Sequence, residues 1–131
     1  MATEYVSWKT GDASKPKPQI VKPNEWVTVQ FNEGAAIVPK NSGTANWAFY
    51  LNIKNASGLG ASKSVDVRFL RDPKGIADFT GQCNLDLTSG SIYSGTWFFN
   101  AKKGQPVALQ IRNNGKKNIT LSTREFKMWI P

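Results

Sequence analysis

The sequence contains no histidine, the side chain that most often serves as a general acid or base and most often binds metals. Its single cysteine, Cys83, excludes an intrachain disulfide and argues against a zinc site, which needs several cysteine or histidine ligands. We interpret Cys83 as a small buried apolar residue rather than a reactive thiol. These absences predict a protein that is not an enzyme and that carries no metal or cofactor.

Long apolar runs are also missing, so the sequence predicts no membrane-spanning segment and no membrane partner. The residues Met1–Tyr5 lack the basic and apolar regions of a signal peptide, and we therefore expect synthesis in a cytosol. With 131 residues, of which 40% are hydrophobic and 11% aromatic, the chain has the size and composition of one globular domain. We expect a single domain over residues 1–131.

Positive charge is in excess, because 17 Lys and Arg residues against 9 Asp and Glu give a formal net charge of +8. This excess favours polyanions or acidic protein surfaces as partners. The lysines gather near predicted turns, as is typical of solvated strand ends. Proteins that bind single-stranded nucleic acid more often interleave arginine and aromatic residues on one face, so the sequence disfavours nucleic acid as a partner.

The acidic and serine residues form no recognisable catalytic motif. Most acids fall in predicted turns or at outward strand positions, where a solvated carboxylate is the ordinary case. Serines are plentiful, but no histidine is present to activate one of them as a nucleophile. The segment Gly58-Leu59-Gly60 lacks the third glycine and the Lys-Ser/Thr pair of a phosphate-binding loop.

Alternation of apolar and polar residues with a period of two is the dominant pattern, and no segment shows a sustained helical pattern. Many short strands at spacings of about 8–12 residues predict an all-β, antiparallel β-sandwich. The clearest strands are Glu25–Phe31, Trp47–Ile53, Val65–Leu70 and Pro106–Arg112. Their shared faces predict a core that contains Val27, Val29, Phe31, Phe49, Leu51, Val67, Phe69, Val107, Leu109 and Ile111.

Two connecting segments carry specific expectations. Residues 11–24 combine three prolines with Lys15, Lys17 and Lys22, which predicts an extended arm or a surface loop. Asn114-Gly115 is a strong signal for a type I′ turn, and it predicts a β-hairpin with a return strand over Ile119–Leu121. A separate last strand is expected over Phe126–Ile130.

Three large aromatic residues fall on the outward faces of the predicted strands: Trp26, Tyr50 and Trp129. Large rings on a sheet surface are usually covered by something. The cover is either another part of the same subunit, such as the proline-rich segment, or a protein partner, or a stacked sugar or base. We take the three rings, together with Lys15, Lys17 and Lys22, as candidate partner contacts.

Several patterns gather between Val65 and Pro131. Val67-Arg68-Phe69-Leu70-Arg71-Asp72 leads into Asp78-Phe79-Thr80-Gly81, the turn Lys103-Gly104-Gln105 precedes the strand Val107–Ile111, and the predicted hairpin Val107–Leu121 precedes the ending Ser122–Pro131. This arrangement resembles small β-sandwich virion proteins of tailed bacteriophages, of the head decoration or minor tail type. It is also similar to the trimeric jelly-roll modules that end many phage fibres.

The resemblance implies a jelly-roll-like β-sandwich with a structural role and no catalytic residues. It implies docking on a major capsid or tail protein, in the virion, as a symmetric homo-oligomer for which a trimer is one arrangement. Two alternatives come from the residues themselves. A carbohydrate-binding module would use Trp26, Tyr50 or Trp129 as stacking platforms, and a single-stranded nucleic-acid-binding barrel is the third hypothesis.

Overall fold

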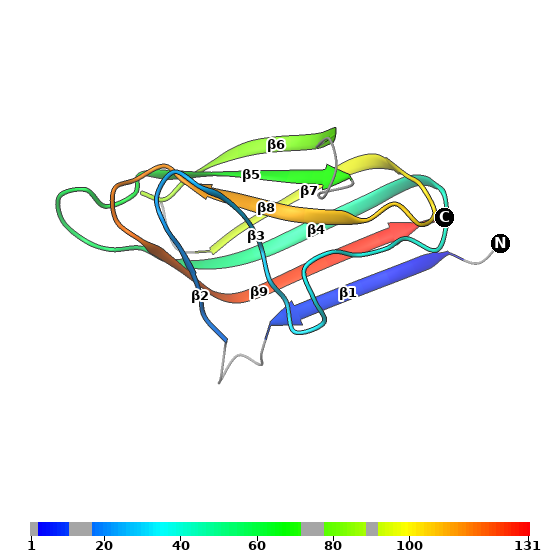
Figure 1. The fold of residues 1–131 in the computed structure, drawn as a ribbon, viewed down its shortest axis with the longest axis horizontal. Helices are drawn as coiled ribbons and strands as arrows, with labels where there is room; N and C mark the ends of the chain where they lie inside the picture. The colour runs from blue at the N-terminus through cyan, green and yellow to red at the C-terminus, as the bar shows by residue number, and fades with distance from the viewer. Residues whose placement is uncertain (1–2, 11–16, 72–77, 89–91) are drawn as a thin grey trace.

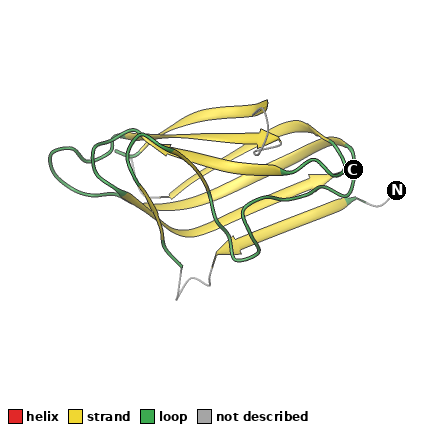
Figure 2. Cartoon of the chain, viewed as in Figure 1, coloured by secondary structure: helices red, strands yellow, loops and turns green. Residues whose placement is uncertain are grey.

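The computed structural model describes residues 3–10, 17–71, 78–88 and 92–131, and within these it contains strands and no helix (Figure 2). The strands are β1 (Glu4–Thr10), β2 (Gln19–Val21), β3 (Trp26–Thr28), β4 (Gly43–Lys54), β5 (Ser64–Arg71), β6 (Asp78–Asp86), β7 (Ile92–Ala101), β8 (Val107–Asn113) and β9 (Ile119–Ile130).

The strands form two antiparallel sheets that stack face to face (Figure 1). Sheet A has the order β1-β9-β4-β7, and β2 pairs with β9 beyond the end of β1. Sheet B has the order β3-β8-β5-β6. The predicted all-β, antiparallel β-sandwich is therefore confirmed.

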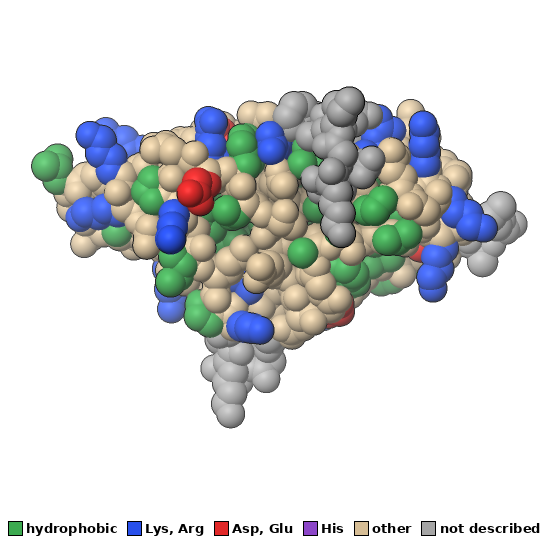
Figure 3. Space-filling model, in the orientation of Figure 1, with side chains coloured by type: hydrophobic (Ala, Val, Ile, Leu, Met, Phe, Trp, Pro, Cys, Tyr) green, Lys and Arg blue, Asp and Glu red, His purple; other side chains and the backbone are tan. Residues whose placement is uncertain are grey.

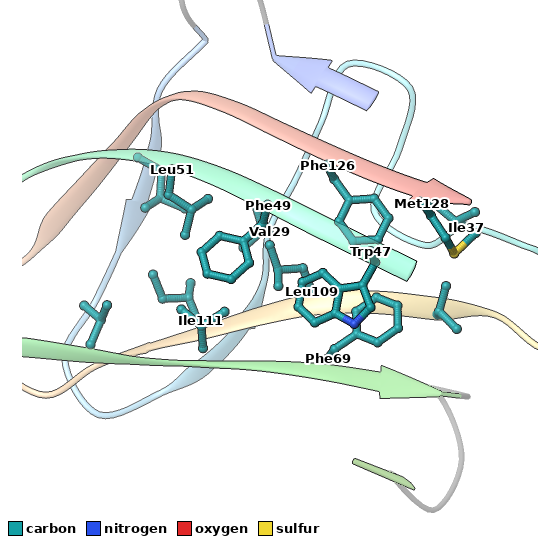
Figure 4. Packing of buried hydrophobic residues seen from close by; sticks show 14 of the residues in the cluster. Val29, Ile37, Trp47, Phe49, Leu51, Phe69, Leu109, Ile111, Phe126 and Met128 are labelled. Carbon is teal, nitrogen blue, oxygen red and sulfur yellow. The ribbon is translucent and has the colours of Figure 1, made fainter. Parts of the chain in front are cut away.

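The core between the sheets is rich in aromatic rings (Figure 4). Trp47 and Phe126 from sheet A meet Phe69 from sheet B, and the rings of Trp47 and Phe69 stack with centroids 4.3 Å apart. Eight of the ten predicted core residues are buried, whereas Val27 and Phe31 are only half-buried. Val27 lies on the edge strand β3, which has one neighbour, and Phe31 lies past the end of that strand.

The predicted hairpin at Asn114-Gly115 is wrong, because β8 belongs to sheet B and β9 to sheet A. The connection crosses from one sheet to the other, and neither residue has the positive φ that a type I′ turn requires. Gly115 is needed for a different reason: a Cβ at this position would lie 2.5 Å from Cα of Ser62. The glycine thus allows the β8–β9 connection to pack directly against the β4–β5 connection.

Ile119–Leu121 and Phe126–Ile130, expected as two strands, are parts of the single strand β9. The inward and outward alternation is interrupted in its middle, where Leu121 and Ser122 are both buried. The pairing of β9 with β4 shifts register at the same place, between Leu51 and Ile53. A bulge of this kind interrupts the alternation of buried and exposed residues along β9, which is why the sequence pattern predicts two strands instead of one.

Residues 11–24 were expected to form an arm or a loop, but part of this segment is a strand. Gln19–Val21 pairs with β9, and the buried guanidinium of Arg124 donates a hydrogen bond of 2.6 Å to the carbonyl of Lys17. The side chain of Gln19 also bonds the backbone at Thr28 and Gln30. The part of the segment that the structure describes is therefore fixed to the sandwich, and Lys15 lies outside the described residues.

Candidate functional site

A row of exposed aromatic rings crosses the outer face of sheet A. Strand register aligns Tyr5 of β1, Trp129 of β9, Asn46 of β4 and Phe98 of β7. The exposed fractions are 56% for Tyr5, 37% for Trp129 and 68% for Phe98. Tyr5 and Trp129 meet edge to face, with ring centroids 5.9 Å apart. The row places three large, solvent-exposed aromatic side chains on one face of sheet A.

Two shallow hollows lie on the same face. One, of about 140 Å³, is beside Trp129, and the other, of about 170 Å³, is beside the half-buried Tyr50. Lys127 and Glu125 form an ion pair of 3.0 Å at the second hollow, and this contact raises the pKa of Lys127 above its ordinary value. The face therefore offers projecting rings and hollows within one surface.

Trp26 does not belong to this surface, because β3 lies in sheet B and Trp26 is on the outer face of that sheet. The guanidinium of Arg68 lies 3.9 Å from its ring centroid, and that of Arg112 lies 5.3 Å away. The Trp26 ring is thus covered by arginines of its own subunit. Of the three possibilities given by the sequence (the same subunit, a protein partner, or a stacked sugar or base), this is the first.

Around Trp26 the outer face of sheet B carries a polar network. Arg112 forms an ion pair of 2.9 Å with Asp66, and Asn84 donates a hydrogen bond of 2.9 Å to the same carboxylate. Burial raises the pKa of Asp66, but hydrogen bonds from Asn84, Asn114 and Arg112, with the charge of Arg112, hold it below its ordinary value. This network explains the polar positions of sheet B as mutual partners.

Lys17 and Lys22 are exposed on either side of β2, along the edge of sheet A that β1 and β2 share. They do not join Tyr50 and Trp129 in one cluster. Of the candidate partner contacts that the structure describes, only Tyr50 and Trp129 lie on the same outer face. Sequence reasoning missed Tyr5 and Phe98, although the alternation of Trp97 and Phe99 with Phe98 could have placed Phe98 outside.

Cys83 is half-buried and packs against the hydrophobic core. Burial and the nearby negative charge of Asp66 raise the pKa of its thiol. The part of the chain that the structure describes has no group of three or more side chains arranged to hold a metal ion. None of its described segments is a helix of the length and apolarity needed to cross a membrane.

No protein-family model matches the sequence, and no curated protein matches it. Solved structures do match the fold. The Eiger TNF domain from S. frugiperda superposes with a TM-score of 0.62 at 11% identity, covering 97% of this chain and 92% of that one. The globular domain of zebrafish complement 1qA superposes with a TM-score of 0.53 at 12% identity, covering 98% and 97%.

A third similar structure is a pilus protein, from work describing Bacillus endospore appendages as disulfide-linked pili. Its TM-score is 0.53 at 11% identity, with 99% of this chain and 91% of that one covered. At these identities the likeness shows the fold alone. The chain is a jelly-roll-like β-sandwich of the kind found in TNF-type and C1q-type domains.

Proposed function

We propose that this protein is a non-enzymatic structural domain that self-associates through the outer face of sheet A and docks on the surface of a phage particle. The observation that carries the proposal is the row formed by Tyr5, Trp129 and Phe98. Aromatic side chains are enriched in the buried centres of protein interfaces, and exposed apolar side chains gathered on one face are typical of such interfaces.

The shape of the face supports contact between unlike parts of two copies. Phe98 projects from β7, at the free edge of sheet A, whereas the hollows beside Trp129 and Tyr50 lie over β4 and β9. A ring from one copy that enters a hollow of the next makes a heterologous contact. Repetition of such a contact forms a ring of copies when the rotation between neighbours closes, and a trimer is one such ring.

A disulfide-linked filament, as described for the pilus protein, does not fit this sequence. Cys83 is the single cysteine, so each copy can form one disulfide at most. One disulfide joins two copies and cannot extend a chain of them. Association beyond a pair of copies therefore has to rest on noncovalent packing, which agrees with the use of exposed rings.

The phage setting and the lack of enzymatic activity rest on the sequence. The resemblance of residues 65–131 to phage virion proteins supports docking on a major capsid or tail protein, and the net charge of +8 suits an acidic shell. The absence of histidine supports a role without catalysis.

The test of self-association is the native mass of the purified protein by light scattering, compared with 14.5 kDa for one chain. We expect an oligomer that Phe98→Ser and Trp129→Ser each convert to monomer. Leu59→Ser is the matched control, since Leu59 is 96% exposed but lies in the β4–β5 loop. If the wild-type protein is a monomer, or if only Leu59→Ser disrupts the oligomer, self-association does not use the outer face of sheet A.

The phage setting is tested separately by co-sedimentation of the wild-type oligomer with purified capsids and tails. We expect binding that weakens as salt rises without being abolished, because charge steers the encounter and apolar contacts remain. Retention on a neutral polysaccharide column without binding to particles would favour the carbohydrate-binding module. Tight and steeply salt-dependent binding to single-stranded DNA would favour the nucleic-acid hypothesis.

A further inference from the structure

At one end of the sandwich, the β4–β5 and β8–β9 connections pack against each other (Figure 1). The amide of Lys116 donates a hydrogen bond of 3.0 Å to the carbonyl of Gly60, and Nζ of Lys117 donates one of 3.0 Å to the carbonyl of Ser57. Gly115 fits against Ser62 with no room for a Cβ. Two loops that are far apart in the sequence therefore form one braced structure.

A hollow of about 660 Å³ lies between these loops. Three lysines line it, and none of the described residues that line it is acidic. Lys and Arg side chains gather at this end of the molecule in Figure 3, in the region of the β4–β5 loop of Figure 1. The lining consists of Leu59, Gly60, Ala61, Lys63, Ser64, Asn114, Gly115, Lys116 and Lys117.

We propose that this hollow binds an anionic carbohydrate chain, whose sulfate, phosphate or carboxylate groups pair with Lys63, Lys116 and Lys117. A concave site lined by three lysines, with no acid among the described residues of its lining, favours a negatively charged ligand. Its volume lies within the range of sites that bind a small ligand.

The rest of the lining favours a sugar over a nucleic acid. None of the described residues around the hollow is aromatic, so bases find no stacking platform, which is the main attraction of single-strand binders. Leu59, which is 96% exposed, and Ala61 are the apolar side chains of the lining, and such side chains suit the C–H face of a sugar ring. Each lysine ammonium is a compact charge that can pair with an anionic group from many directions. Lysines therefore suit the sulfate, phosphate or carboxylate groups of a flexible sugar chain, whose positions vary.

The site is built before any ligand arrives. Gly58 and Gly60 have φ of 84° and 85°, a conformation that holds Leu59 outward between them. The side-chain amide of Asn114 donates a hydrogen bond of 3.2 Å to Oγ of Ser64, which ties the rim to β5. Little ordering is therefore needed on binding. The hollow lies at the end of the sandwich and is distinct from the face proposed for self-association.

The test compares two double variants that remove equal charge. Lys63→Gln with Lys116→Gln changes the hollow and keeps the brace from Lys117 to Ser57, whereas Lys102→Gln with Lys103→Gln changes the β7–β8 turn at the opposite end of β8. Binding to heparin, dextran sulfate and neutral dextran is measured by titration at fixed salt. We expect the first variant to bind the sulfated chains about tenfold more weakly and the second to bind within about twofold of wild type.

A third variant separates the shaped site from net charge. Gly115→Ala leaves the charge unchanged, but its Cβ would force Ser62 and the β4–β5 loop away. If it remains folded by circular dichroism, we expect weaker binding to the sulfated chains. If the two double lysine variants lose equal affinity for the sulfated chains, binding depends on net charge alone and the proposal is overturned. Stronger binding to oligo-dT or to polyglutamate than to the sulfated chains would overturn it as well, in favour of nucleic acid or an acidic protein.

Discussion

Trp47 of β4 and Phe69 of β5 stack across the two sheets, with ring centroids 4.3 Å apart and planes 24° from parallel. Trp47 also lies within 6 Å of the ring centroids of Phe49, Trp97 and Phe126, so one indole joins aromatic residues of sheet A to sheet B. Stacked and tilted aromatic pairs add stabilisation beyond the area they bury. This cluster packs the two sheets against each other.

Phe69→Ala should lower the free energy of unfolding by about 3–5 kcal/mol, because it removes the partner of Trp47 and leaves a cavity between tightly packed sheets. Urea denaturation followed by tryptophan fluorescence measures the change. Leu59→Ala is the control, since Leu59 is almost fully exposed and should shift stability by about 0.5 kcal/mol or less. A Phe69→Ala cost as small as that of the control would contradict the position of Phe69.

Gly95→Ala should destabilise the protein by about 1–3 kcal/mol through overpacking. A Cβ at position 95 would lie 2.7 Å from Cε1 of Phe49, its cross-strand neighbour on β4. Phe49→Leu removes the atoms that clash, so the double variant should be more stable than the sum of the two single effects predicts. Strict additivity of the two changes in urea midpoint would show that the contact is absent.

Asp66 should make stability depend on pH in the acid range. Its pKa in the folded protein lies below the ordinary value of 3.8, so its contribution is fully present above that value and is lost as pH falls through the folded pKa. Asp66→Asn lacks this titration. The gap in unfolding free energy between wild type and Asp66→Asn should therefore shrink below about pH 4. If the difference in unfolding free energy instead grows on acidification, the pKa of Asp66 is raised in the folded protein, which contradicts the lowered pKa assigned here.

Cys83 should react slowly with iodoacetamide at pH 8 in the folded protein and much faster in urea. Half-burial limits access, and the raised pKa of the thiol lowers the fraction of thiolate. Because the charge of Asp66 contributes to this pKa, Asp66→Asn should speed the reaction in the folded state. Equal rates in folded and unfolded wild-type protein would show that Cys83 is open to solvent.

The strand faces were predictable because alternation is a local property. Phe49 and Leu51 repeat on one side of a single strand, and any pairing partner buries them together. The path of the chain between sheets was not predictable in this way. Asn114-Gly115 has the residues of a tight turn, but Gly115 packs against the distant Ser62, and no local pattern reports that contact.

The candidate site was predictable only in part for the same reason. Tyr50 and Trp129 were correctly placed outside the core, and alternation carries that information. Whether Trp26 shares their face depends on which sheet β3 joins, and this follows from pairing with β8. Arg68 on β5 and Arg112 on β8 cover the Trp26 ring. These contacts join residues far apart in the sequence, and a single sequence does not reveal them.

The place of β9 between β1 and β4 governs how this chain can fold. Residues 4–10 and 46–54 both pair with residues 119–130, so the middle of sheet A cannot form until residues 119–130 are in position. Joining segments so distant in sequence costs chain entropy before contacts form, and domains of this type fold in milliseconds to seconds. A nascent chain that stalls before residue 119 leaves one edge of β4 unpaired, and such an edge is prone to aggregation.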